Sequence, residues 1–178
     1  MLNNLQIAIS GKSGCGNSSV SQIIAERLQL EFINYTFHDI AREMRIPFTK
    51  IMKLAEEDPQ YDLFLDKRQV NLASGRRCVL GSRLAIWLLK DAQLKVFLEA
   101  SLKVRAERIA YREQKDSNKA LKETKERDRR DHKRYLKLYS INNDNYDFAD
   151  LIIDTEQGDQ YYVADIIEQF LKDKGMLK

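Results

Sequence analysis

The stretch "GKSGCGNSS" at residues 11–19 constrains the fold of this chain more than any other feature of its sequence. An apolar run, "LQIAIS", comes directly before it, and a segment with apolar residues at helical spacing follows, so the stretch joins a strand to a helix. Glycines allow backbone N–H groups to wrap an anion, and a helix N-terminus adds roughly half a positive charge. The stretch therefore predicts a phosphate-binding loop at the carboxyl edge of a parallel sheet.

The loop departs from the usual phosphate-loop pattern, G-x-x-x-x-G-K-[ST], at one position. Gly11, Gly16 and Ser18 fit the pattern, but Asn17 stands where the lysine is expected. Lys12 is the nearest cation in sequence, and we expect it to fold over the phosphates; a lysine that faces solvent is the alternative. Ser18 is expected to place its hydroxyl on Mg²⁺. The residues expected at the nucleotide are Gly11, Lys12, Ser13, Gly14, Cys15, Gly16, Asn17, Ser18 and Ser19.

Strands that alternate with helices over the 178 residues predict an α/β fold in one domain, with a five-stranded parallel sheet. The expected strands are 5–10, 31–35, 77–82, 93–100 and 149–155. Helices are expected over 19–28, 101–114, the basic segment that follows, and 161–173. Residues 36–74 show a helical pattern with breaks near Pro47 and Pro59. This stretch is too long for a simple crossover, so it predicts a helical insertion.

The formal charge of +3 is concentrated in one segment. Residues 119–137 hold nine Lys or Arg against four Asp or Glu, a net charge of +5, which favours an anionic partner. The interleaved carboxylates, and the absence of an aromatic residue before Tyr135 in this segment, argue against specific nucleic-acid binding. We expect a cytoplasmic protein without a membrane span or signal peptide, in which Cys15 and Cys78 are reduced thiols.

Several segments, in this order, resemble the cytidylate kinases, and most closely their archaeal-type branch. That branch has a similar lysine-poor loop, with a threonine at the position of Asn17. It also has an "EEDP…D…LD-R-R-Q" stretch that "AEEDPQYDLFLDKRQV" (55–70) matches, and an "EGRLA" that "GSRLA" (81–85) resembles. "VRAERIAYR" (104–112) is similar to its counterpart there, and "ERDRRDHKRY" (126–135) is similar to the lid helix of bacterial cytidylate kinases. The resemblance covers nearly the whole chain.

The resemblance implies a P-loop kinase with a three-layer core and two moving parts. The core would comprise residues 1–35, 75–112 and 138–178, the acceptor-binding helical region 36–74, and the mobile lid 113–137. The implied reaction is transfer of the γ-phosphoryl group of ATP, with Mg²⁺, to CMP or dCMP. The implied partners are these small nucleotides only, and we expect a monomer.

The resemblance also implies roles for a set of arginines. Arg127, Asp131 and Arg134 lie at i, i+4 and i+7 and share a helix face. The two arginines would reach phosphates, and Asp131 would hold an arginine or a ribose hydroxyl. Arg108 would pack on the adenine near Asp154 and Thr155, and Arg112 would meet the phosphates. Acceptor contacts are expected from Arg42, Arg68, Arg83 and Arg130. Arg105 is expected at the surface.

Two departures leave other functions open. Asn17 replaces a lysine or threonine, and Gly81 replaces the acidic residue that usually orients water on Mg²⁺ after the third strand. One alternative is a kinase for another small acceptor. Another is a catalytically weak nucleotide-binding or RNA-associated module, in which the basic helix is merely solvated. Arginines arrayed on two separate helices favour the kinase. The base of the acceptor cannot be named, because it depends on side chains of the helical insertion.

Overall fold

The computed structural model describes residues 4–177, and in it five parallel strands form one sheet, as expected. The strands are β1 (Gln6–Gly11), β2 (Glu31–Ile33), β3 (Cys78–Gly81), β4 (Leu94–Glu99) and β5 (Leu151–Asp154). Their order in the sheet is β2-β3-β1-β4-β5. All six residues of the central strand β1 are buried, which explains why apolar and polar residues do not alternate along it.

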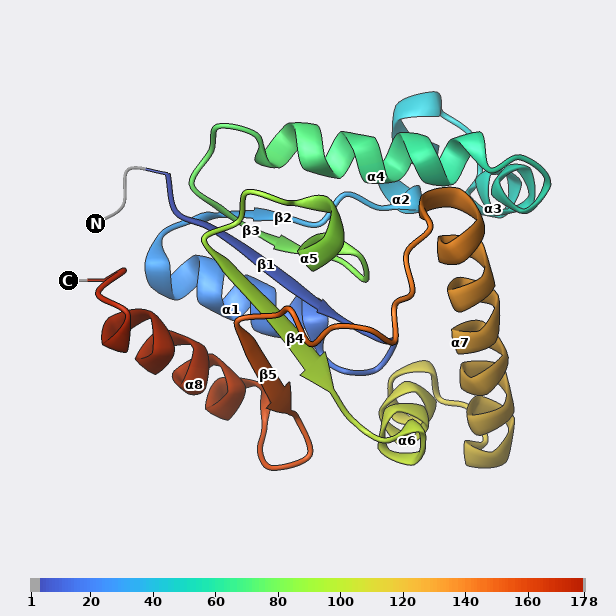
Figure 1. The fold of residues 1–178 in the computed structure, drawn as a ribbon. Coiled ribbons are helices and arrows are strands. Elements are labelled where there is room, and N and C mark those ends of the chain that lie inside the picture. Colours follow the sequence, from blue (N-terminus) through green and yellow to red (C-terminus); the bar gives the residue numbers. More distant parts are fainter. Residues whose placement is uncertain (1–3, 178) are drawn as a thin grey trace.

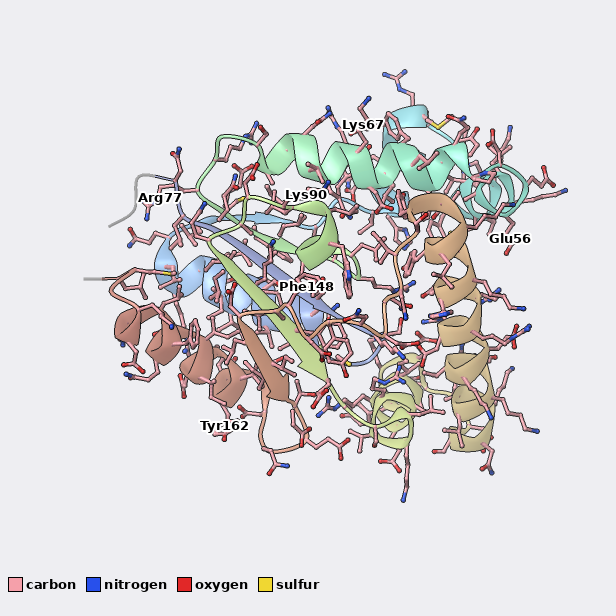
Figure 2. All side chains as sticks on the ribbon, in the orientation of Figure 1. Glu56, Lys67, Arg77, Lys90, Phe148 and Tyr162 are labelled. Atoms are coloured by element: carbon pink, nitrogen blue, oxygen red, sulfur yellow. The ribbon has the colours of Figure 1, made fainter. Side chains whose placement is uncertain are left out.

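Helices cover both faces of the sheet, which gives the expected three layers (Figure 1). On one face lie α1 (Asn17–Leu28) and α8 (Gln160–Asp173), whose Ile24 and Ile167 are fully buried. On the other face lie α5 (Ala85–Leu88) and the C-terminal end of α4 (Gln60–Ala73). The connection before β5 also lies here, and its Phe148 lies over β4 in Figure 2 and packs edge-on against Trp87 of α5.

The helical insertion comprises α2 (Phe37–Met44), α3 (Phe48–Glu57) and α4, and it breaks where the sequence predicts. Pro47 and Pro59 each stand directly before a helix, at the position where a missing N–H matters least. The insertion has a small core of its own, in which Ile40 and Ile51 are buried. It forms a lobe beside the sheet, and the C-terminal end of α4 joins this lobe to the sheet (Figure 1).

Two helices stand at the carboxyl end of the sheet: α6 (Leu102–Glu113) and α7 (Ser117–Tyr139). Side chains cap both N-termini, with Ser101 accepting from the Val104 N–H and Asp116 from the Lys119 N–H. In Figure 1, α7 runs from α6 to the helical insertion. This basic helix therefore borders the space between the glycine loop and the insertion. None of the helices within residues 4–177 has both the length and the hydropathy to cross a membrane.

One element was not expected. The four-residue helix α5 follows the loop after β3, and it is too short to show a helical period in the sequence. Its Ala85 and Ile86 are buried under the sheet, and the Ile86 N–H donates to the Ser10 hydroxyl of β1 at 3.1 Å. The helix thus fixes the loop that carries Arg83.

Candidate active site

A cleft of about 620 Å³ lies at the carboxyl end of the sheet, between the glycine loop, the helical insertion and α7. The loop lines it from Lys12 to Ser19. Five arginines from three elements also line it: Arg83, Arg108, Arg112, Arg127 and Arg134. Thr155, at the end of β5, is a further expected residue in the lining. The structure thus brings most of the predicted residues to one place.

The loop has the geometry of an anion site. Gly14 and Gly16 have φ angles of 89° and 93°, in the left-handed region that favours glycine. Gly16 is also the N-cap of α1 and offers no side-chain cap, so the first N–H groups of this helix have no side chain to satisfy them. The hydroxyl-bearing Ser18 and Ser19 of the first helical turn are exposed to the cleft. A phosphate fits these donors and the positive end of the helix.

Asn17 does not take the place of the missing lysine. Its Nδ2 donates to the Gly11 carbonyl oxygen at 2.8 Å, so the amide closes the loop from within. A Cβ on Gly11 would lie 2.6 Å from Asn17 Oδ1 and 2.5 Å from the Leu98 carbonyl oxygen, so the loop is packed tightly here. Asn17 is therefore a structural residue of the loop, and the positive charge must come from elsewhere.

Lys12 lines the cleft but its ammonium group pairs with a carboxylate. Lys12 Nζ lies 2.6 Å from Oδ1 of Asp144, a residue in the connection between α7 and β5. This hydrogen bond holds the pKa of Asp144 below its usual range. The other Asp144 oxygen lies 3.2 Å from Nδ1 of His132 on α7. Lys12 therefore ties the glycine loop to the end of the cleft where α7 lies, and its role at the phosphates stays a prediction.

The arginines near the loop bind mainly uncharged oxygens. Arg108 donates to the Thr155 hydroxyl at 2.8 Å and carbonyl at 2.6 Å, and to the Gly14 carbonyl at 3.4 Å. Arg127 of α7 reaches the Ser13 hydroxyl at 3.5 Å. Arg108 thus connects the loop to the end of β5, where the adenine was expected.

The expectation of a surface position for Arg105 is wrong. Its side chain is buried, and its guanidinium makes two parallel contacts with the Asp128 carboxylate, at 3.1 and 2.7 Å. It also donates to the Ser13 and Ala100 carbonyls. Arg105 therefore connects α7 and the loop to α6, and a guanidinium paired with a carboxylate and bonded to two carbonyls can be buried at a tolerable free energy.

At the far end of the cleft the arginines bind carboxylates. Asp131 accepts from Arg83 at 2.6 Å and from Arg134 at 3.1 Å, so it holds an arginine, as the resemblance implied. Arg134 also lies 3.2 Å from Asp62 of α4. Burial raises the pKa of Asp62, although the charge of Arg134 opposes this shift. These four groups join α4, α7 and the loop after β3.

Other predicted residues lie elsewhere among the described residues. Arg42 is exposed and pairs with Asp39, Arg68 is exposed with its guanidinium 5.9 Å from the centre of the Tyr35 ring, and Arg130 is exposed on α7. Asp154 lines a neighbouring hollow and caps the turn after β5. Arg112 lines the cleft but pairs with Glu113. Contacts of these side chains with nucleotides stay predictions.

The sequence reasoning missed a polar stripe on α4. Asp62, Asp66 and Gln69 lie at i, i+4 and i+7, and all three line the cleft. Lys67, on the opposite side of the same helix, points away from the cleft in Figure 2. The spacing is the one that identified Arg127, Asp131 and Arg134, so the same rule applied to residues 60–73 would have found the stripe.

The structure gives a reason for the absent carboxylate after β3. A Cβ on Gly81 would lie 2.5 Å from Ser21 Oγ and 3.3 Å from a ring carbon of Phe32. Ser21 of α1 is fully buried, so it has little room to move aside. The close approach of α1 to β3 thus excludes any side chain at position 81.

Comparisons with known proteins agree with this geometry. The sequence model of the Cytidylate kinase-like family matches residues 6–157. A protein named cytidylate kinase 2 from Borrelia garinii subsp. bavariensis is 47% identical over 98% of this chain and 99% of its own length. The cytidylate kinase of Methanocaldococcus jannaschii is 36% identical over 90% of this chain and 94% of its own.

Solved structures support the fold alone. The shikimate kinase of Acinetobacter baumannii has a TM-score of 0.65 at 20% identity, over 97% of this chain and 96% of its own. The deoxyadenosine kinase of M. mycoides has a TM-score of 0.61 at 16% identity, over 94% of this chain and 100% of its own. The glycine loop, the arginine-lined cleft and the full-length relatives agree, and the chain belongs to the cytidylate kinase-like family.

Proposed function

We propose that this chain is a cytidylate kinase that transfers the γ-phosphoryl group of ATP to CMP or dCMP. An oxygen of the acceptor phosphate attacks the γ-phosphorus, and the bond between that phosphorus and the bridging oxygen of ADP breaks. Negative charge spreads over the moving group, so catalysis needs position and positive charge more than covalent chemistry. Relatives named cytidylate kinase at 44–47% identity over almost their full length support the activity.

One observation carries the proposal within the molecule. Five arginines from the loop after β3, from α6 and from α7 line a single cleft opposite the glycine loop. A protein that only binds a nucleotide needs cations around one set of phosphates. This cleft has cations at both ends, which suits a donor and an acceptor that approach each other.

The residues present are compatible with Mg²⁺. No group of three or more His, Cys, Asp or Glu side chains among residues 4–177 is arranged to hold a metal ion. Mg²⁺ in phosphoryl-transfer sites is held mostly by phosphates and water, with few protein ligands. The exposed Ser18 hydroxyl at the start of α1 is a suitable oxygen ligand. When bound, the ion would neutralise part of the phosphate charge that Asn17 leaves unbalanced.

The proposal includes movement of the helical region and of the lid. In it, the acceptor binds between the helical region 36–74 and the cleft, and residues 113–137 close over the nucleotides as a lid. Lys12 then exchanges Asp144 for a phosphate oxygen, and Arg112 turns from Glu113 toward the nucleotides. A monomer that works in the cytoplasm completes the proposal.

The test is an ADP-release assay against the common ribo- and deoxyribonucleoside monophosphates. CMP or dCMP is expected to give the highest kcat/KM. A value for AMP, GMP or dTMP at least tenfold above that for CMP would show that the acceptor is another nucleotide. No turnover with any acceptor would favour a nucleotide-binding module without kinase activity.

A further inference from the structure

The polar stripe of α4 presents several acceptor oxygens to the cleft, and among its carboxylates Asp66 is the one held by a hydrogen bond rather than by an arginine. Asp62 has one oxygen 3.2 Å from Arg134, and Gln69 is buried and donates to the Tyr35 carbonyl at 2.6 Å. Asp66 Oδ2 accepts from the Tyr139 hydroxyl of α7 at 2.5 Å. Among the described residues no side chain or backbone group donates to its second oxygen. Asp66 therefore presents a hydrogen-bond acceptor, held in place by Tyr139, to a cleft whose charged lining is mostly cationic.

Asp66 lies beyond the place where the acceptor phosphate is expected. Arg83 and Arg134 are the cations at this end of the cleft, and Arg134 contacts Asp62. Asp66 is one helical turn along α4 from Asp62, about 6 Å along the axis. The contacts from Arg134 to Asp62 and from Tyr139 to Asp66 form two successive links between α7 and α4. A nucleotide whose phosphate lies near the Arg134–Asp62 contact would extend its base toward the Tyr139–Asp66 contact.

Resting on the proposed function, we propose that Asp66 selects cytosine by accepting a hydrogen bond from its exocyclic amino group, and that Tyr139 positions the Asp66 carboxylate. Cytosine has an amino donor where uracil and thymine have a carbonyl acceptor. A carboxylate facing that carbonyl would repel it and leave two acceptors unpaired. The contact separates cytosine from uracil and thymine but not from adenine, which also has an amino group.

The ionisation of Asp66 fits this role. Burial raises its pKa to about 6, which the Tyr139 hydrogen bond partly opposes. The charged groups that face it are Asp62 on its own helix, Arg134 on α7 and Arg83 from the loop after β3. Burial and the contact with Asp66 raise the pKa of Tyr139, so the phenol keeps its proton and donates. Above a pH of about 6, Asp66 is a carboxylate and thus only an acceptor.

The first experiment compares kcat/KM for CMP and UMP in the wild type and in Asp66→Asn. The amide can donate to the carbonyl of uracil, so the CMP/UMP ratio is expected to fall at least tenfold, with a gain for UMP. Asp62→Asn is the matched control, one turn away on the same face of α4. It weakens the hold on Arg134 and should lower both values in parallel, leaving the ratio within threefold of the wild type.

Tyr139→Phe tests the positioning role and leaves Asp66 in place. Without the hydroxyl, the pKa of Asp66 should rise further, because a hydrogen bond that lowers it is lost. The CMP/UMP ratio measured against pH should therefore reach its plateau at a higher pH than in the wild type. The acceptor phosphates of CMP and UMP titrate alike, so they cancel in the ratio. If Tyr139 had only a packing role, the pH at which the CMP/UMP ratio reaches its plateau would be the same in Tyr139→Phe as in the wild type.

The outcomes separate the inference from the function on which it rests. A wild type that prefers CMP, together with a folded Asp66→Asn variant with an unchanged ratio, would overturn the role of Asp66 alone. An unshifted pH profile in Tyr139→Phe would overturn the positioning role, even if Asp66→Asn did not fold. A wild type without activity on CMP or dCMP would overturn the proposed function itself.

Discussion

The arginines at the two ends of the cleft have different kinds of partner. Near the glycine loop, Arg108 and Arg127 contact carbonyl and hydroxyl oxygens of Gly14, Thr155 and Ser13. At the acceptor end, Arg83 and Arg134 contact the carboxylates of Asp131 and Asp62. An arginine on a carbonyl keeps its full charge for a ligand, whereas an arginine on a carboxylate is already balanced.

In the proposed reaction, the phosphates of the two nucleotides are therefore bound in different ways. The triphosphate meets Arg108 and Arg127, which contact carbonyl and hydroxyl oxygens. The acceptor phosphate must share Arg83 and Arg134 with Asp131, or displace it, so its binding requires side chains to move. Arg108 and Arg127 are thus preorganised for a phosphate, whereas Arg83 and Arg134 are not.

The largest expected effect comes from breaking the arginine set on α7, which spans both ends. Arg127→Ala and Arg134→Ala should each lower kcat on the order of 10³-fold, because each removes a cation from the moving phosphoryl group. Steady-state kinetics with ATP and CMP measure this. Arg129→Ala is the control, since Arg129 is exposed on the same helix and pairs with Glu126. Changes below threefold at both cleft positions would mean that the helix is merely solvated.

The next effect concerns the loop end, where Lys12, like Arg112, pairs with a carboxylate. Lys12→Ala should raise KM for ATP or lower kcat at least tenfold, about 1.4 kcal/mol. Asn17→Lys should recover part of this loss in the double variant. Asp144→Asn frees Lys12 and should lower neither ATP affinity nor kcat. If Lys12→Ala leaves both constants unchanged, the arginines and the metal supply the charge alone.

A further effect is expected on thermal stability, through the raised pKa of Asp66 at the acceptor end. The folded-state pKa of Asp66, about 6, lies above the value of about 3.9 for an unfolded chain. Folding is therefore penalised increasingly as pH rises from about 4 through 6. A rise from about 3.9 to about 6 corresponds to about 3 kcal/mol, so Asp66→Asn should raise Tm at pH 8 by about 6–12 °C more than it does at pH 4. Equal shifts at both pH values, measured by thermal unfolding, would contradict the raised pKa.

The weakest effect expected is binding of nucleic acid to α7. Its carboxylates offset its lysines and arginines, and Asp128 and Asp131 are bound to arginines. RNA or DNA should therefore bind only without sequence preference, and with a shallow dependence on salt. Fluorescence anisotropy at physiological salt measures this. Submicromolar, sequence-selective binding would instead favour an RNA-associated module.

The sequence predicted the sheet, the insertion and the loop well, because their signals are local. Apolar runs mark the five strands, and Pro47 and Pro59 mark the breaks in the insertion. Contacts between distant segments were harder to predict. The partner of Lys12 is 132 positions away, and the burial of Arg105 depends on Asp128, which is on another helix. Partners of this kind are decided by how helices pack.

The carboxylates that pair with Arg83 and Arg134 also bear on the hydrolysis of bound ATP. A kinase with ATP bound but no acceptor can lose the γ-phosphoryl group to water. While Asp131 is paired with Arg83 and Arg134, these two cations of the proposed site are not free to stabilise that side reaction. Arrival of the acceptor phosphate is the event that competes for them. In the proposed reaction, the ion-pair cluster thus makes arrival of the acceptor a condition for full catalytic power, and it limits the loss of ATP when no acceptor is bound.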